Sequence, residues 1–309
     1  MKKTTFYGLM TLTALTIASC SPENDGAETS PSQVAYQTLS LNFFESSIDP
    51  FGSSASSRTR ADDNTLAKSF NRLDVALFPQ FVTNNDTVYR YSQLSTDDGY
   101  GSLTVKVPVG AYKLVGVANQ KSPSVAATIH RVDSVSFESN KVGDVACVSK
   151  DVTVAADNST VTSCQLKRAV TLFRLKEADV LSSEIAKIKV TVEGRCGYKL
   201  NPSTGYSLNS STSVNKTFNT TSLTEATRKS YVIDFYMFLG SDTQTVSVKM
   251  ELYGDTDMKN LLKSYTFSDV TLKVNYITTY TGNFLTAQNA SSFTFSDGEM
   301  TSSGYDKTF

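Results

Sequence analysis

The alternation of apolar and polar residues along many short segments constrains the fold of this chain more than any other feature. Leu39, Leu41 and Phe43 alternate with a serine and an asparagine. Successive side chains of a β-strand point to opposite faces of its sheet, so this period of two predicts a strand over residues 36–44 with one buried face. The same period recurs over residues 245–252.

Residues that favour turns separate these segments. Pro108-Val109-Gly110 stands between the alternating runs 103–107 and 111–117, which predicts a hairpin. A second hairpin is predicted around the turn Ala156-Asp157-Asn158-Ser159. Helical periodicity is weak throughout, with room for two turns at most in residues 182–188. Many short strands separated by turns predict an all-β chain built of β-sandwiches rather than βαβ units.

The length of the chain suits more than one such sandwich. Its 309 residues exceed what a single hydrophobic core ordinarily organises. One predicted hairpin ends near residues 164–168, and a new apolar run begins at Ala169. We therefore predict two β-sandwich domains in tandem, at residues 35–165 and 166–309.

The first twenty residues predict export and lipidation. Two lysines precede an apolar run, Phe6 to Ala18, which is too short to span a bilayer and reads as a secretory signal. Ile17-Ala18-Ser19-Cys20 resembles the bacterial lipobox, in which the leader is cut before the cysteine. That resemblance implies a signal peptide at residues 1–19 and acyl chains such as palmitate on Cys20, enough for stable anchoring. The alternative is an ordinary signal peptide with a coincidental cysteine.

The segment after Cys20 predicts a tether and a location. Residues 20–34 are acidic and rich in Pro and Ser, a composition that cannot bury a core. Acidic residues this close to the lipidated cysteine resemble the surface-export signal of Bacteroidota lipoproteins; the alternative is a plain solvated linker. We expect a protein anchored by lipid to the outer membrane and exposed at the cell surface.

The composition argues against catalysis and against nucleic-acid binding. Lys and Arg number 29 and Asp and Glu number 30, so no basic excess suits a polyanion. The chain has one histidine and no nucleotide-binding, metalloprotease or serine-hydrolase motif. A glycosidase carboxylate pair is not excluded by sequence, but tryptophan, the usual sugar platform, is absent. We predict a non-enzymatic protein without a cofactor.

Three cysteines besides Cys20 allow several states. Cys147 and Cys164 flank a predicted hairpin and could form a disulfide, and buried free thiols are the alternative. With Cys196 and His130 they would supply four zinc ligands, but their spacing lacks the paired CxxC signature, so no metal site is predicted. The segment Asp255-Thr-Asp257 lacks the remaining ligands of a calcium loop and is predicted to be a solvated turn.

Five segments resemble the FimB-like accessory subunits of Bacteroidales type V fimbriae, and together they extend over nearly all of the chain after the leader. Their order and spacing carry the resemblance, since no single segment is very specific. The segments are Arg72-Leu-Asp-Val-Ala-Leu-Phe, Val107-Pro-Val-Gly-Ala-Tyr-Lys-Leu-Val-Gly-Val-Ala-Asn, Leu166-Lys-Arg-Ala-Val-Thr-Leu-Phe-Arg-Leu, Asn201-Pro-Ser-Thr-Gly-Tyr and Val274-Asn-Tyr-Ile-Thr-Thr-Tyr-Thr-Gly-Asn-Phe.

This resemblance implies a fold, a place and a set of partners. The fold would be two tandem transthyretin-like, Greek-key β-sandwich domains, and the place would be the anchor or tip of a fimbrium that supports adhesion. Other fimbrial subunits would be the partners through β-strand exchange, together with outer-membrane lipid at Cys20 and ligands on host or bacterial surfaces.

The same resemblance draws attention to Arg58-Thr59-Arg60. In that class of pilus an arginine-specific protease removes the first strand of stalk subunits, and a neighbour's strand fills the groove. Arg58 and Arg60 follow the predicted first strand in a Ser/Gly-rich segment, where such a cut would fall. An ordinary exposed basic loop is the alternative, and the sequence leaves open whether the chain is an anchor, a tip or a stalk subunit.

A different class of function would use the same signal and the same sandwiches. A surface glycan-binding lipoprotein of a polysaccharide-uptake system also carries a lipobox and β-sandwich domains. The absence of tryptophan argues against this alternative, because flat aromatic rings are the usual means of holding sugars.

Overall fold

The computed structural model describes residues 35–45, 65–80, 88–120, 125–208, 213–229 and 231–300. All of them belong to one compact unit, which begins at Ala35. The prediction of an all-β chain is confirmed, since strands dominate these residues. The described helices are the α-helices α1 (Thr65–Ser69) and α2 (Glu225–Arg228) and the 3-10 helices η1 (Glu138–Asn140) and η2 (Ala290–Ser292).

The described helices are short, and none lies where the sequence allowed one. The two helical turns allowed for residues 182–188 do not form, because a turn leads there directly into a strand that begins at Lys187. None of the helices among the described residues has the length and apolar character needed to cross a membrane.

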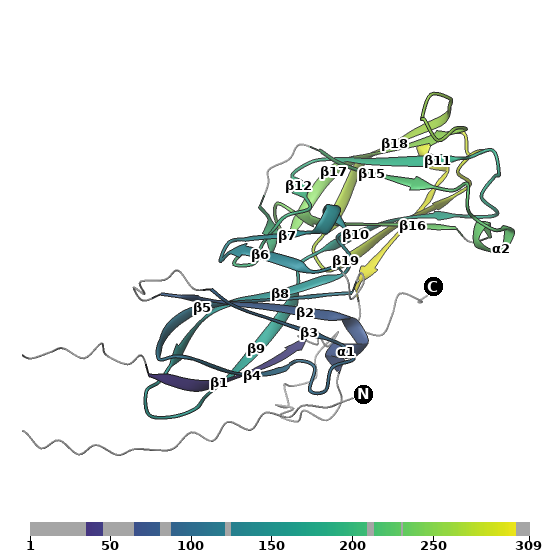
Figure 1. The fold of residues 1–309 in the computed structure, drawn as a ribbon. Helices are drawn as coiled ribbons and strands as arrows, with labels where there is room; N and C mark the ends of the chain where they lie inside the picture. Colours follow the sequence, from purple (N-terminus) through teal and green to yellow (C-terminus); the bar gives the residue numbers. More distant parts are fainter. Residues whose placement is uncertain are drawn as a thin grey trace, which may run out of the picture. The chain divides into compact units, whose positions relative to one another are not determined.

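Seven strands form the first sandwich, which Figure 1 shows. They are β1 (Tyr36–Glu45), β2 (Arg72–Pro79), β3 (Tyr89–Leu94), β4 (Ser102–Pro108), β5 (Gly110–Asn119), β8 (Val145–Val154) and β9 (Thr160–Arg168), in the sheet order β3-β2-β5-β8-β9-β1-β4. The ladder between β8 and β9 is restricted to Ala146 with Arg168 and Cys147 with Lys167. Strands on both sides of this junction contribute to one core, so the sheet folds over into two layers.

The predicted hairpin at Pro108-Val109-Gly110 is wrong in its pairing. Both strands form, but β4 pairs with β1, whereas β5 pairs with β2 and β8. Val109 donates its backbone N–H to Ala35 O at 2.8 Å, and Gly110 has a φ of 151°, which favours glycine. The turn therefore carries the chain from one layer to the other instead of folding it back within one layer.

The predicted hairpin around residues 156–159 has the expected order of strands, β8 and then β9. The two strands pair only at the ends remote from the turn, and near the turn they separate. From there β8 continues along β5 and β9 continues along β1. This separation places the two strands in different layers.

Nine strands form the second sandwich, which Figure 1 shows. They are β10 (Thr171–Glu177), β11 (Lys187–Glu193), β12 (Cys196–Gly197), β15 (Ser213–Asn219), β16 (Val232–Leu239), β17 (Thr243–Tyr253), β18 (Leu261–Lys273), β19 (Tyr276–Gly282) and β20 (Thr294–Glu299). One sheet has the order β12-β16-β10-β19-β20 and the other β15-β11-β17-β18. The predicted alternation in β17 is confirmed: Val246, Val248, Met250 and Leu252 are buried in the core between the two sheets.

The two sandwiches begin in the same way. β1 pairs in parallel with β9 and antiparallel with β4, and β10 pairs in parallel with β19 and antiparallel with β16. Each of these first strands carries inward apolar residues and ends in a glutamate, Glu45 in β1 and Glu177 in β10. The two sandwiches share the pairing pattern of their first strands more than their amino-acid sequence. A comparison of the two halves of the sequence therefore does not reveal the repeat.

A third core joins the two halves of the sequence. A small sheet of order β14-β13-β7-β6 contains β6 (Ala127–Arg131), β7 (Ser134–Phe137), β13 (Leu200–Asn201) and β14 (Tyr206–Ser207). Phe238 of β16 stacks on Phe137 of β7 with ring centroids 5.8 Å apart, and outward residues of β5 and β10 belong to the same cluster. The sandwiches are thus packed on one another; the domain bounds at residues 35–165 and 166–309 stay a prediction.

Replacing Phe238 by alanine should show how strongly this third core contributes. Phe238 is fully buried, so Phe238→Ala should lower the free energy of unfolding by roughly 3–5 kcal/mol through lost contacts and a cavity. Phe295→Ala is the matched control, because Phe295 is 54% exposed and should change stability by about 0.5 kcal/mol or little more. Urea denaturation of both variants checks the difference, and equal effects would contradict a buried third core.

Candidate functional site: the first strand and its neighbours

The first strand is the candidate site, because it is the element on which the predicted exchange depends. Cys20, Arg58 and Arg60 lie outside the described residues, so lipidation and processing stay predictions. The strand predicted over residues 36–44 is confirmed as β1. Its inward residues Leu39 and Leu41 are fully buried.

β1 has a hydrogen-bonded neighbour on each side. Residues Tyr36–Asn42 pair antiparallel with β4, and residues Leu39–Glu45 pair in parallel with β9. The strand therefore fills a slot within its layer and is not an edge strand (Figure 1). Its departure would expose the backbone N–H and C=O groups along β4 and β9, a template for another strand.

The slot is shaped for the side chains of β1. A β-carbon placed on Gly116 of β5 would lie 2.6 Å from Cε1 of Phe43 and 3.0 Å from Val148. That glycine therefore leaves the space that the Phe43 ring occupies in the core. Real β-carbons do not approach other atoms so closely. The glycine of β5, in the opposite layer, therefore makes room for an aromatic ring at this position of β1.

The end of β1 is held by a buried ion pair. Glu45 Oε1 lies 2.9 Å from Nη2 of Arg168, and Ser69 donates its hydroxyl to Glu45 Oε2 at 2.9 Å. Arg168 Nε also donates to Asp144 Oδ1 at 2.7 Å. The side chains of Glu45, Arg168 and Asp144 are 11%, 6% and 3% exposed, so the pairs are shielded from water.

The same arginine reaches the second sandwich. Its Nη1 donates to Asn275 Oδ1 at 3.1 Å and to Met300 O at 2.9 Å, and its guanidinium lies 5.8 Å from the ring centroid of Phe70. Arg168 thus joins the end of β1, the start of β8 and the last described residue. In the sequence, Arg168 stands at the end of a predicted hairpin and within one of the five resembling segments, but nothing there marks it as a functional residue, because its partners lie between 24 and 132 residues away.

The residues considered for metal binding are not brought together. His130 is exposed and shares a 2.7 Å hydrogen bond with Ser136. Asp255 accepts backbone N–H groups of Lys259 and Asn260, as in a self-contained turn. Within the described segments, no group of three His, Cys, Asp or Glu side chains could hold a metal ion.

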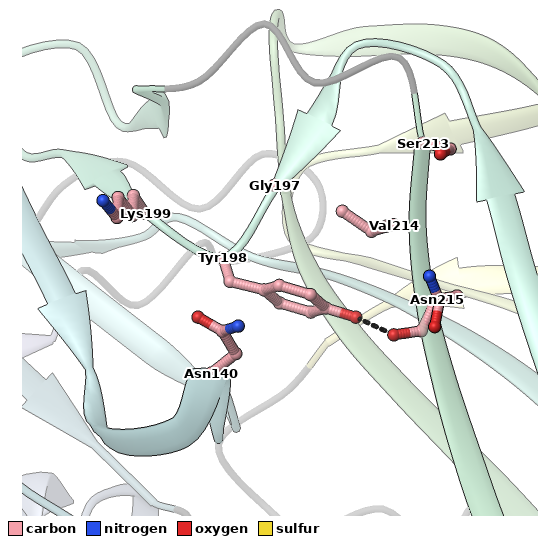
Figure 2. A pocket seen from close by; sticks show the side chains of 7 residues that line it. All are labelled: Asn140, Gly197, Tyr198, Lys199, Ser213, Val214 and Asn215. Atoms are coloured by element: carbon pink, nitrogen blue, oxygen red, sulfur yellow. Dashed lines mark hydrogen bonds between the residues drawn. The ribbon is translucent and has the colours of Figure 1, made fainter.

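A polar hollow of about 420 Å³ lies beside η1, and Figure 2 shows the seven residues that line it. Tyr198 lies between Asn140 and Asn215, and its hydroxyl donates to Asn215 O at 2.8 Å. One face of the Tyr198 ring stacks on Phe235 with centroids 6.2 Å apart. Both the hydroxyl and one ring face of Tyr198 are therefore engaged within the protein.

One protein family matches more than half of the chain. The match covers residues 127–300, from β6 to just beyond β20, and the family is described as Family of unknown function (DUF6562). The chain belongs to the DUF6562 family. β1 precedes the matched region, whereas Arg168, Asp144 and Met300 lie within it.

No curated protein matches this DUF6562 chain. Among the solved structures similar to it are a candidate adhesin from Bacteroides ovatus (12% identity, TM-score 0.46, covering 77% of this chain and 83% of that one) and a candidate polysaccharide-binding protein from Bacteroides thetaiotaomicron (11%, 0.46, 80% and 92%). The fimbrial anchor protein Mfa2 from Porphyromonas gingivalis is also similar (9%, 0.41, 84% and 95%). At TM-scores below 0.5, these similarities carry no argument about function.

The three cysteines of the DUF6562 region are free and buried, so the disulfide between Cys147 and Cys164 does not form. Cys147 belongs to the third core, whereas Cys164 belongs to the core of the first sandwich. Their side chains therefore lie on opposite faces of the sheet. Burial raises the pKa of Cys147 to about 12 and the pKa values of Cys164 and Cys196 to about 11, which keeps these thiols protonated.

The thiol state can be counted directly. In the exported Cys20→Ala protein, Ellman's reagent should find three thiols per chain after unfolding in guanidinium without reductant. The folded protein should react far more slowly, because the three thiols are buried and protonated. A count of one thiol after unfolding would contradict the structure and restore the disulfide.

Proposed function

We propose that this DUF6562 protein is a non-enzymatic accessory subunit of a cell-surface fimbrium that supports adhesion. It is brought to the outer membrane by lipid on Cys20, and after a cut at Arg60 the position of β1 can accept a strand from another subunit by β-strand exchange. The observation that supports this proposal most is the place of β1. It is central in its layer, and the chain continues from it to α1 through residues 46–64, which include Arg58 and Arg60.

Burial gives the exchange its driving force. Leu39, Leu41 and Phe43 are 0%, 0% and 6% exposed, and each large apolar side chain contributes about 1.5–3 kcal/mol when fully buried. A sandwich that has lost β1 exposes this apolar slot and two unpaired backbone edges. An incoming strand restores the backbone hydrogen bonds, and its alternate side chains set the register.

Cleavage between β1 and α1 would decide the role of the subunit. With Arg60 intact, β1 and the lipid stay in one chain with both sandwiches, and the protein acts as an anchor. With Arg60 cut, the lipid departs when β1 departs, and the slot becomes open to a partner. The same fold thus serves either an anchor or a stalk or tip subunit.

Locking β1 in its slot should block exchange. Ser40 of β1 and Thr104 of β4 are paired, and their hydroxyl oxygens lie 3.2 Å apart, so the double variant Ser40→Cys with Thr104→Cys should form a disulfide. Cells that carry the locked protein should incorporate much less of it into sheared fimbriae than cells that carry either single variant. Undiminished incorporation of the locked protein would contradict exchange at β1.

The lipid can be tested independently of exchange. Cys20→Ala should release the protein from the outer-membrane fraction, because the acylated residue is lost. The intact mass and N-terminus of the wild-type protein extracted from cells should show acylation at Cys20 or a new N-terminus at Ala61. Unchanged membrane association of the Cys20→Ala protein would contradict the anchor.

A further inference from the structure

A buried guanidinium lies at one end of the slot that β1 fills. We propose that Arg168 selects the strand that occupies this slot by requiring a glutamate at the position of Glu45. The partner segment is then a strand with three inward apolar residues in alternation, followed two residues later by glutamate. This inference rests on the proposed exchange at β1 and adds to it the chemistry of the partner.

Arg168 is fixed by groups that do not belong to β1. Asp144, Asn275 and the carbonyl of Met300 accept from its Nε and Nη1 at 2.7–3.1 Å. None of these acceptors belongs to β1, so the departure of β1 does not remove them. The remaining amino group, Nη2, is the one that Glu45 meets at 2.9 Å. The guanidinium therefore stays aimed at the end of the vacated slot.

The surroundings of Glu45 suit a carboxylate better than other side chains. One carboxylate oxygen accepts from Arg168 and the other from Ser69. Leucine at this position would remove the acceptor that Nη2 of Arg168 has on β1, and taking an acceptor from a buried charged donor is costly. Lysine would place a second cation beside the guanidinium. Glutamine could accept from Arg168 and pair with Ser69 through its amide, but it carries no charge, so it should rank between glutamate and leucine.

The carboxylate also fixes register and direction. Glu45 lies on the inward face with Leu39, Leu41 and Phe43, because these residues are two apart. A shift by one residue would turn the glutamate outward together with the apolar residues. A strand inserted in the reverse direction would carry its glutamate to the other end of the slot. Arg168 thus favours a strand that enters in this direction and in this register, with its glutamate at the position of Glu45.

Competition between peptides tests this selection in the full chain after its leader. A sequence-specific protease site is inserted between Ser57 and Arg58 of the Cys20→Ala protein, and the purified protein is cut there. The cut protein is incubated with labelled peptides of residues 35–45 until exchange reaches equilibrium. The peptides have the native sequence or carry Glu45→Gln, Glu45→Leu or Glu45→Lys, and the bound label is measured after gel filtration.

The native peptide should displace the resident strand, and Glu45→Leu should bind about tenfold more weakly or worse, since the buried guanidinium of Arg168 then loses the carboxylate that β1 supplies. A matched control peptide combines Glu45→Leu with Asn42→Glu, which restores the net charge at an exposed outward position. It should bind as weakly as Glu45→Leu. In a cut protein that also carries Arg168→Leu, the preference for glutamate should disappear.

The possible results separate the two proposals. Equal binding of all the peptides to the unaltered protein would overturn selection by Arg168 and leave strand exchange intact. Recovery of binding by the peptide with the outward glutamate would show that net charge and not position matters, which also overturns selection. Failure of every peptide, the native sequence included, to enter the slot would overturn exchange at β1 and this inference with it.

Discussion

The parallel pairing of β1 with β9 is the interaction on which the first sandwich depends. It joins the first described strand to the last strand of the same sandwich, more than a hundred residues later in the chain. Such a contact forms only after the intervening strands have folded into layers, because a long loop must be closed first. The slot for β1 is therefore a product of the whole sandwich, which suits a strand that a partner could supply.

The second sandwich repeats this parallel pairing, but its first strand cannot be supplied by a partner. β10 pairs in parallel with β19 as β1 does with β9, yet β10 follows β9 after only two residues and cannot leave without unfolding both sandwiches. Its terminal Glu177 accepts backbone N–H groups of Phe284 and Asp179 rather than a guanidinium. Desolvation by burial is the main cause that raises the pKa of Glu177 above its ordinary value, and the backbone N–H groups of Phe284 and Asp179 oppose that shift.

The sequence predicts the strands better than their partners. The period of two identifies the buried face of β1 and of β17 because it depends only on neighbours in the chain. The pairing of β4 and β5 depends on which layer each strand joins, and the turn at Pro108-Val109-Gly110 looks the same in either case. The disulfide expectation failed for a related reason. Cys147 pairs with Lys167, and Cys164 is three residues from Lys167, so the two cysteines face opposite sides.

Arg168 carries no signal in the sequence because its significance arises only from the fold. A buried ion pair is weak evidence for stability, since apolar residues of similar volume often serve as well or better at such a position. The chain keeps three charges and a serine there, and of the three charged residues only Glu45 belongs to β1. In the proposed exchange, what Glu45 adds is discrimination, because a strand without the matching carboxylate removes one buried acceptor from the guanidinium of Arg168. The further contacts of Arg168 with Asn275 and Met300 hold that donor in place whether or not the slot is filled, as a selective group requires.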